Sequence, residues 1–368
     1  MSPAQQESER SKKQKILTLQ KYFLMKLRAL NILKVLLFPC IAVISISCSN
    51  NTPLELYRFY AMGTWIEITL QPNEESQLAL REIEDFLYQY EKDFYPWAEG
   101  ELKELNTSIT DSESIFISPL MLELLEKSQF MFNASEGRFD PSIGPLVELW
   151  GFNNMISQMT VPEDDDIQNL LSERLTLNDI AVNKSINAPS VQPIRRGTLL
   201  LDFGGIAKGQ SINEIRKILL NFEHENFVIN AGGDLLVGTT DSKDLQTYSI
   251  GIRSPREESI AFNLEIYSNE SVFTSGDYER FFEEGNNRLH HLINPINGYP
   301  WTETASVTVI HDDPIIADAA ATALFFTTQE NWLAVTEILD IAMAMRIDAD
   351  GSIDITENMR GRIVPNIE

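Results

Sequence analysis

The sequence predicts an α+β fold rather than a doubly wound α/β fold. Stretches in which apolar and polar residues alternate, the pattern of half-buried strands, are mostly joined by short turns and not by regular crossover helices. Other stretches repeat their apolar residues at helical spacing. The chain has 368 residues, 43% of them hydrophobic, which is enough for a sizeable core in one large domain or two ordinary ones.

The N-terminal half of the sequence predicts one strand and two helices. Residues 57–72 alternate and predict a strand, whereas residues 76–94 have apolar residues at helical spacing. Residues 118–135 predict a second helix, in which Ser118 caps the N-terminus and a proline occupies the first turn. Residues 153–175 are polar and acidic, so we expect an excursion over the surface.

The C-terminal half predicts strands joined by short turns, with two helices. Residues 198–203 predict a strand, residues 210–222 a helix, and residues 226–239 two strands joined by a glycine turn. Residues 314–327 predict a helix rich in small residues. Further strands are predicted within residues 245–255, 261–269, 270–282 and 304–313.

The chain is strongly acidic, with a formal net charge of −25. The residues before Cys48 are net basic, so the acidity belongs to the rest of the chain. A body with that charge cannot bind nucleic acid by neutralising phosphates, which excludes nucleic acid as a partner. We interpret the acidity as a solubility feature.

The N-terminal segment is typical of a targeting signal. Lys26, Arg28 and Lys34 accompany a mostly apolar run of about a dozen residues, which is short for a membrane span. The run ends at Ser47-Cys48, a small residue followed by a cysteine. This resembles a bacterial lipoprotein signal, in which the cysteine becomes the lipidated first residue. An uncleaved membrane anchor is the alternative.

These features divide the sequence into three parts. Residues 1–24 are polar and basic, and we expect them to be a non-native extension before a true start at Met25. Residues 25–47 are expected to be the lipoprotein signal peptide. Residues 48–368 show no composition break or internal repeat and are expected to form one functional domain.

A glycine-rich loop, Gly204 to Gly209, lies between the predicted strand at 198–203 and the predicted helix at 210–222. Such a loop offers free backbone N–H groups and the positive end of a helix to an anion such as a phosphate. Its spacing matches neither the dinucleotide-binding fingerprint nor the P-loop. A turn that uses glycine for a positive φ is the alternative, and it is the commoner explanation of such a loop.

Asp318 and Thr322 are four residues apart and share one face of the predicted helix. A carboxylate and a hydroxyl are hard oxygen ligands that suit Mg²⁺ and not Zn²⁺. Two side chains do not close a site, but Mg²⁺ commonly completes its shell with waters and substrate phosphates. The alternative is a buried helix in which both side chains satisfy backbone groups.

His290 and His291 stand at a predicted strand end before an Asn-Pro turn. Adjacent strand residues point to opposite faces, so this pair is a poor joint metal site. One histidine could serve as a general base while the other is structural, or both could be surface residues without a role.

Residues 136–152 force the chain through fixed turns beside aromatic residues. The segment could serve packing alone. It could also hold a flat ring by stacking and bind an amide edge through Asp140.

Together these motifs resemble the ApbE family, whose members are FAD:protein FMN transferases. The segments that carry the resemblance occur in the family's order: AMGTWIEI, GRFDPSIGPLVELWGF, LDFGGIAKGQSIN, VINAGGDLLVG, FTSGDYERFFEEGNNRLHHLINPINGYP and SVTVIHDDPIIADAAATALFF. The resemblance spans residues 55–345. It implies an α+β fold in which helices flank antiparallel sheets and a flavin nucleotide lies in a central cleft.

The resemblance also implies a set of site residues. The Mg²⁺ ligands would be the carbonyl of Ala207 and the side chains of Asp318 and Thr322, and the family's important histidine falls on His291. Its contacts to the flavin nucleotide fall on Met62, Trp97, Arg138, Phe139, Asp140, Lys208 and Asn213. Two of these depart from the family's pattern, because Asn213 replaces an aspartate and Trp97 lies where a Ser-x-Tyr pattern is more common.

The implied reaction transfers FMN from the substrate FAD to a threonine or serine hydroxyl of an acceptor protein and releases AMP. The implied acceptors are subunits of sodium-pumping NADH:quinone reductase or of Rnf-type complexes. With the lipid anchor, this implies a place on the periplasmic face of the bacterial inner membrane. Two rival functions remain open: a metal-dependent FAD pyrophosphatase that yields FMN and AMP, and a lipoprotein that only binds flavin.

Overall fold

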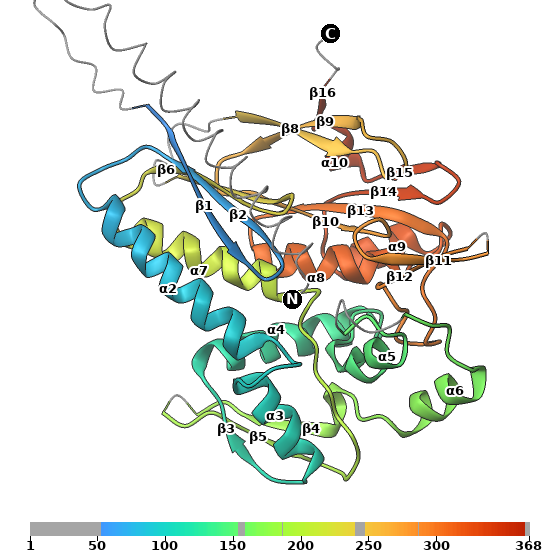
Figure 1. Cartoon of the computed structure of the whole chain (residues 1–368). Coiled ribbons are helices and arrows are strands. Elements are labelled where there is room, and N and C mark those ends of the chain that lie inside the picture. Colours follow the sequence, from blue (N-terminus) through green and yellow to red (C-terminus); the bar gives the residue numbers. More distant parts are fainter. Residues whose placement is uncertain (1–52, 154–158, 186, 240–246, 286, 365–368) are drawn as a thin grey trace, which may run out of the picture. The chain divides into compact units, whose positions relative to one another are not determined.

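The computed structural model describes residues 53–153, 159–185, 187–239, 247–285 and 287–364 (Figure 1). The chain divides into two compact units, residues 1–51 and residues 52–368, and every described residue lies in the second unit. The predicted extension, the predicted signal peptide and Cys48 lie outside the described residues. The second unit is an α+β fold, as the sequence predicts.

An eight-stranded sheet forms the centre of the fold. Each neighbouring pair in it is antiparallel, in the order β1-β2-β6-β7-β10-β13-β14-β15. The bounds are β1 (Glu55–Ala61), β2 (Thr64–Leu70), β6 (Asn226–Ala231), β7 (Asp234–Thr239), β10 (Ser271–Gly276), β13 (Thr304–His311), β14 (Met343–Asp348) and β15 (Ile353–Ile355). Gly232 and Gly233, both with positive φ, form the turn between β6 and β7, which confirms the predicted strand pair.

Two predictions of strands are wrong. Residues 57–72 do not form a single strand, because the chain turns at Met62 and Gly63 and returns as β2. These residues have φ values of 52° and 73°, the left-handed conformation of a tight hairpin turn. Residues 198–203 form no strand, since the side chain of Asn106 bonds to the N–H of Leu201 at 2.8 Å and to its carbonyl at 3.1 Å. A side-chain amide here satisfies the backbone groups that a neighbouring strand would otherwise bind.

Three helices pack on one face of the central sheet: α2 (Ser76–Phe94), α7 (Ala207–Asn221) and α8 (Pro314–Phe325). Helix α8 contacts β10, β13 and α7, and α7 also contacts α2 (Figure 1). Eleven of the twelve residues of α8 are buried, which its small side chains allow. The structure confirms the three helices that the sequence predicts in this layer, and α7 begins at Ala207, inside the glycine loop.

A smaller sheet covers the opposite face of the central sheet. It has the order β16-β9-β8, with β16 (Ile363–Val364), β9 (Ile260–Tyr267) and β8 (Thr247–Arg253). Phe273 of β10 packs in the core that includes α8, whereas its neighbour Val272 packs with Leu264 of β9. Adjacent strand residues thus separate the two cores, as the pleat requires.

A third group of elements follows α2 and supplies the surroundings of Asp140. It consists of α3 (Glu101–Thr110), β3 (Ile115–Phe116), α4 (Pro119–Ala134), η1 (Pro141–Ile143), α5 (Gly144–Leu149), α6 (Asp164–Glu173), η2 (Leu177–Asp179), β4 (Ile180–Asn183) and β5 (Ser190–Pro193). The predicted cap of α4 is confirmed, since Ser118 Oγ accepts the N–H of Met121 at 3.1 Å. The acidic segment at 153–175 is more than a surface excursion, because Ile167 of α6 is fully buried.

The remaining elements complete the C-terminal half. They are the hairpin of β11 (Phe281–Glu284) and β12 (Asn287–His290), α9 (Trp332–Ile338) and α10 (Glu357–Arg360). His290 is the last residue of β12, and a tight turn follows in which Ile293 pairs with Pro300. This hairpin positions both candidate histidines.

Candidate functional site

The glycine loop brings the start of α7 against α8. A Cβ at Gly209 would lie 2.3 Å from the carbonyl oxygen of Pro314, and one at Gly205 would lie 3.0 Å from Oγ1 of Thr322. Neither glycine has a positive φ. The alternative explanation from the sequence is therefore wrong: these glycines permit close approach between two segments and do not serve a left-handed turn.

The three candidate Mg²⁺ ligands lie around this junction. Asp318 is 4% exposed, and its Oδ2 accepts the N–H of Gly209 at 2.8 Å. Thr322, one turn further along α8, lies against Gly205, and its Oγ1 is 3.2 Å from Oγ of Ser275. The carbonyl of Ala207, the first residue of α7, accepts the hydroxyl of Tyr90 at 3.1 Å. The structure thus brings together the ligand set that the resemblance implies.

The charges at this junction suit a divalent cation. Burial raises the pKa of Asp318, with Asp234 adding to the effect and Lys208 opposing it. Lys208 forms an ion pair with Asp234, whose other oxygen accepts the N–H of Thr274 at 3.0 Å. Burial favours the neutral form of Lys208, but the carboxylates of Asp234 and Asp318 outweigh it and raise its pKa. Two carboxylates therefore share one lysine, which leaves negative charge for a cation to balance.

No cluster of three or more His, Cys, Asp or Glu side chains that could hold a metal ion occurs in the part of the chain that the structure describes. A site built on Asp318, Thr322 and the Ala207 carbonyl would leave most of the shell to other oxygens. Mg²⁺ is commonly bound in this way, through one or two carboxylates plus waters and substrate phosphates. The residues present therefore fit Mg²⁺ in contact with a phosphate-bearing substrate.

The two histidines have different surroundings. His290 is buried, its Nε2 lies 2.5 Å from the carbonyl oxygen of Trp301, and its ring meets the edge of Phe325. His291 is half-buried, and both its backbone N–H and its Nδ1 lie within reach of the Arg280 carbonyl, at 3.0 and 3.3 Å. When Nδ1 donates to that carbonyl, Nε2 is the proton acceptor that remains. We therefore interpret His290 as a structural residue and His291 as the candidate general base.

The environment of His291 is cationic. Burial lowers its pKa to about 3, and the charges of Arg280, His290 and Lys208 act in the same direction. Arg280 donates a hydrogen bond to the carbonyl of Phe152, and its charge partly opposes the rise that burial causes in the pKa of Asp202. A neutral imidazole between cationic side chains is suited to an anionic ligand, whose charge would raise the pKa of the histidine again.

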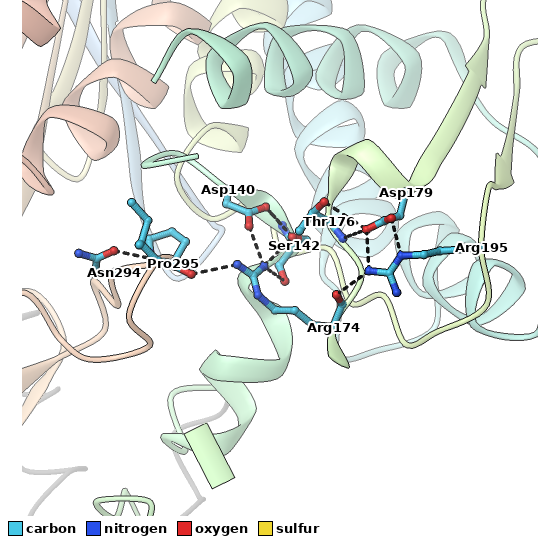
Figure 2. A network of polar contacts seen from close by, with 9 residues as sticks. Asp140, Ser142, Arg174, Thr176, Asp179, Arg195, Asn294 and Pro295 are labelled. Atoms are coloured by element: carbon cyan, nitrogen blue, oxygen red, sulfur yellow. Dashed lines mark hydrogen bonds and ion pairs between the residues drawn. The ribbon is translucent and has the colours of Figure 1, made fainter. Parts of the chain in front are cut away.

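Other residues of the protein bind the side chains of the segment Arg138-Phe139-Asp140. Arg138 donates to the carbonyl of Ser135 at 2.9 Å, and Phe139 is 3% exposed. Asp140 Oδ2 forms an ion pair with Arg174 at 2.7 Å, while Oδ1 accepts the N–H and the hydroxyl of Ser142 (Figure 2). The structure thus gives Asp140 protein partners on both oxygens, and its contact with a flavin stays a prediction.

Lys208 is described above, and the other three predicted flavin contacts outside this segment lie on separate elements. Met62 occupies the tip of the β1–β2 hairpin, where its N–H donates to Glu91 at 2.9 Å. Trp97 is half-buried against the core that contains Trp150 and Phe152. Asn213 is buried in α7, and its Oδ1 accepts from Arg216 at 2.5 Å. Their roles toward a flavin also stay predictions.

Sequence patterns missed four polar residues around these sites: Tyr90, Arg174, Asp234 and Arg280. Asp234 follows the predicted Gly232-Gly233 turn and Arg280 lies eleven residues before His291, so both stand inside motifs that the sequence analysis singled out. Tyr90 lies in a plain amphipathic helix, and no pattern marks it. Arg174 lies in the acidic segment that we expected to be a surface excursion.

The comparison with protein families settles which family has this arrangement. The model of the ApbE family matches residues 62–345, which include every site residue named above. The chain belongs to the ApbE family. This confirms the resemblance drawn from the sequence motifs.

Curated relatives in the ApbE family are named FAD:protein FMN transferase. The protein of that name from Rhodobacter capsulatus is 31% identical over 312 residues, which cover 83% of this chain and 57% of that protein. The one from Vibrio cholerae is 28% identical over 277 residues, covering 74% of this chain and 78% of that protein. The chain thus spans a little over half of the first relative's length and more than three quarters of the second's.

Solved ApbE structures share the fold. The ApbE protein of Thermotoga maritima superposes with a TM-score of 0.76 at 26% identity, covering 85% of this chain and all of that one. The apo flavinyl transferase ApbE of Pseudomonas stutzeri gives a TM-score of 0.73 at 22% identity, covering 86% of this chain and 98% of that one. These likenesses confirm the predicted fold class.

Proposed function

We propose that this chain is an FAD:protein FMN transferase that moves FMN from FAD to a threonine or serine hydroxyl of an acceptor protein and releases AMP. The observation that carries the proposal is the junction of α7 and α8, where Asp318, Thr322 and the Ala207 carbonyl meet around a glycine loop. Family membership and the names of the curated relatives support the same activity.

FAD is the substrate, and its pyrophosphate lies at this junction, with the flavin in the central cleft. The ammonium of Lys208 binds phosphate oxygens there. Arg280 adds a second positive charge on the side of His291. These groups bind and orient the pyrophosphate so that the FMN phosphorus faces the incoming hydroxyl.

Asp318, Thr322 and the Ala207 carbonyl would hold Mg²⁺, which would supply positive charge to neutralise charge that develops on the phosphate oxygens. The fit rests on the hard oxygen donors and on the excess of carboxylate charge beside Lys208.

His291 acts as the general base. A threonine hydroxyl is a weak nucleophile at its own pKa, so its proton must leave as its oxygen attacks the FMN phosphorus. Nε2 of His291 takes that proton while the Arg280 carbonyl holds Nδ1. The new oxygen–phosphorus bond replaces the bond to the AMP phosphate, and AMP leaves. The phosphate charge of bound FAD raises the pKa of His291 from its low value in the free protein, which makes it a better base in the complex.

The acceptors are subunits of sodium-pumping NADH:quinone reductase or of Rnf-type complexes, and the protein is anchored by lipid on Cys48 at the periplasmic face of the bacterial inner membrane. The family resemblance supports the acceptors, and the Lys/Arg-flanked apolar run before Cys48 supports the anchor. Within the described ranges, no helix has the length and apolar character needed to cross a bilayer.

The test is incubation of the protein with FAD, Mg²⁺ and an acceptor domain that carries the target threonine. Yellow fluorescence that stays with the denatured acceptor, and that disappears when the threonine is replaced by valine, supports the transferase. Release of free FMN and AMP with an unlabelled acceptor contradicts it and identifies a pyrophosphatase. Binding of FAD without turnover contradicts it as well.

A further inference from the structure

The acidic segment before Leu175 contains a buried arginine. Arg174 follows directly after α6, in a stretch that is otherwise rich in Asp and Glu. Its side chain is 8% exposed, and that of its partner Asp140 is 1% exposed. A buried ion pair contributes little to stability by itself, because removing both charges from water offsets their attraction. Stability alone therefore does not explain why Arg174 is buried at this position.

One guanidinium joins two segments that are far apart in the sequence. Nη1 of Arg174 donates to Asp140 at 2.7 Å and to Oγ of Ser142 at 2.8 Å, and Nη2 donates to the carbonyl of Pro295 at 3.0 Å (Figure 2). The first segment carries the predicted flavin contacts. The second is the turn that begins after His291. Arg174 is thus a direct link between the two sides of the candidate site.

Helix α6 lies along the same turn. The hydroxyl of Tyr299 donates to Asp164 at 2.6 Å at the start of the helix, and a Cβ at Gly298 would lie 2.4 Å from Ile167 in its middle. With Arg174 at its end, the helix contacts the turn at three places along its length. Helix α6 and Arg174 therefore restrain the turn that follows His291.

Hydrogen bonds within the turn connect the restrained residues with His291. The N–H of Ile293 donates to the carbonyl of His291 at 3.0 Å, and the N–H of Asn294 donates to the carbonyl of Tyr299 at 2.8 Å. Asn294 also accepts the N–H of Ile296 through its side chain at 2.9 Å. Few backbone rotations remain free between the Pro295 carbonyl and His291, so a shift at one end displaces the other.

We propose that Arg174 is a positioning residue for His291. By fixing the Pro295 carbonyl against the Asp140–Ser142 segment, it sets the place of the imidazole relative to FAD bound on the other side. This inference rests on the proposed function of His291 as the base. A displacement of roughly 1 Å in such a group is enough to slow a reaction by about 10²-fold.

The test compares Arg174→Met and Arg174→Lys with the control Arg195→Met. Arg195 donates to Asp179 and to the carbonyl of Arg174, but it touches neither Asp140 nor Pro295 and its side chain is 49% exposed. Lysine retains the charge opposite Asp140 but has a single nitrogen, which cannot reproduce the fork between Asp140 and Pro295. Each full-length variant is assayed for thermal unfolding, FAD affinity, kcat and KM of FMN transfer, and amide hydrogen exchange at residues 293–298.

We expect faster exchange at residues 293–298 and a drop of about tenfold or more in kcat for both Arg174 variants, with FAD affinity changed far less. Arg174→Lys should recover much of the thermal stability lost in Arg174→Met without recovering kcat. Arg195→Met should match the unmodified protein in exchange and in kcat.

A kcat that recovers together with thermal stability in Arg174→Lys would overturn the inference, because Arg174 would then be structural only. Unchanged exchange at residues 293–298 in both Arg174 variants would overturn it too. The exchange and FAD-affinity measurements need no turnover. An unmodified protein that transfers no FMN would therefore refute the proposed function, while the exchange data would still decide whether Arg174 holds the turn.

Discussion

Replacement of Asp318 by asparagine separates the two roles that the structure gives this side chain. The amide oxygen of the substituted asparagine can still accept the N–H of Gly209, which lies 2.8 Å from Oδ2 of Asp318. At this hydrogen bond the loss is therefore limited to its charge assistance, about 1 kcal/mol. Burial raises the pKa of Asp318, which shows that its charged form is disfavoured there, and asparagine removes that charge. The two effects oppose each other, so we expect the free energy of unfolding to change by about 1 kcal/mol or less.

The expected effect on activity is far larger. Asp318 is the charged member of the candidate ligand set, and a metal ion contributes several kcal/mol of charge stabilisation in the transition state. Since about 1.4 kcal/mol corresponds to a factor of ten in rate, FMN transfer should fall by about 10²- to 10³-fold. Added Mg²⁺ should restore it only in part.

The assay pairs thermal unfolding with initial rates of FMN transfer over a series of Mg²⁺ concentrations. Asp313→Asn is the matched control, because Asp313 caps the same helix by accepting the N–H of Ile315 at 2.9 Å and belongs to no candidate ligand set. This control should lose up to about 1 kcal/mol of stability and keep its activity. Near-normal transfer by Asp318→Asn without extra Mg²⁺ would refute the metal assignment. Equal and parallel losses in both variants would show that Asp318 only caps a helix.

Further predictions concern the histidines, the glycine junction and the anchor. His291→Ala should bind FAD but transfer FMN slowly, with His290→Ala milder; the reverse ranking, measured by single-turnover kinetics, would move the base to His290. Burial lowers the pKa of His291 from 6.5 to about 3, so its contribution to stability is complete above pH 6.5 and is lost as the pH falls toward 3. His291→Asn should therefore flatten the dependence of the unfolding free energy on pH in that window, and urea titrations at several pH values would show an unchanged slope if this reasoning were wrong. Gly209→Ala should destabilise the protein by about 1–3 kcal/mol, because its Cβ would lie 2.3 Å from the carbonyl of Pro314; calorimetry that finds no loss would exclude the tight junction. Cys48→Ser should abolish incorporation of labelled fatty acid and release the protein from membranes, whereas an unlabelled unmodified protein with a different mature N-terminus would refute the lipidation site.

Features that depend on neighbours in the sequence could be predicted. The helix at 76–94, the Ser118 cap and the turn at Gly232-Gly233 each follow from a few consecutive residues, and the structure confirms all three. The pairing of Asp318 with Thr322 on one face of a helix follows from their spacing alone.

Features that depend on partners distant in the sequence could not be predicted from the sequence. The sequence predicts a strand at residues 198–203, but the backbone of Leu201 bonds instead to the side chain of Asn106, 95 positions away. Arg174 reads as a surface residue in an acidic segment, yet its partners Asp140 and Pro295 lie 34 and 121 positions away. Long-range hydrogen bonds leave no periodic trace in the sequence, so burial and partner of a polar residue become visible only in the fold.

The glycine loop shows the same limit at the candidate site. Its composition predicts either a phosphate loop or a left-handed turn, and both explanations concern the loop itself. The structure gives Gly205 and Gly209 a different task, the close approach to Thr322 and Pro314 on another helix. Since that helix follows more than a hundred residues later, the sequence alone could not reveal why glycine is needed there.

The central claim is that FMN goes from FAD to an acceptor hydroxyl at the junction of α7 and α8, and product stoichiometry tests it most directly. FAD, Mg²⁺ and a threonine-bearing acceptor are incubated with the protein; AMP is quantified, and the acceptor is examined by intact mass and by mapping of the modified residue. The account predicts one AMP for each acceptor that gains one FMN on a threonine or serine, and only traces of either product in the same time with the Asp318→Asn variant. AMP formed with free FMN and an unmodified acceptor, or equal yields from Asp318→Asn, would contradict it.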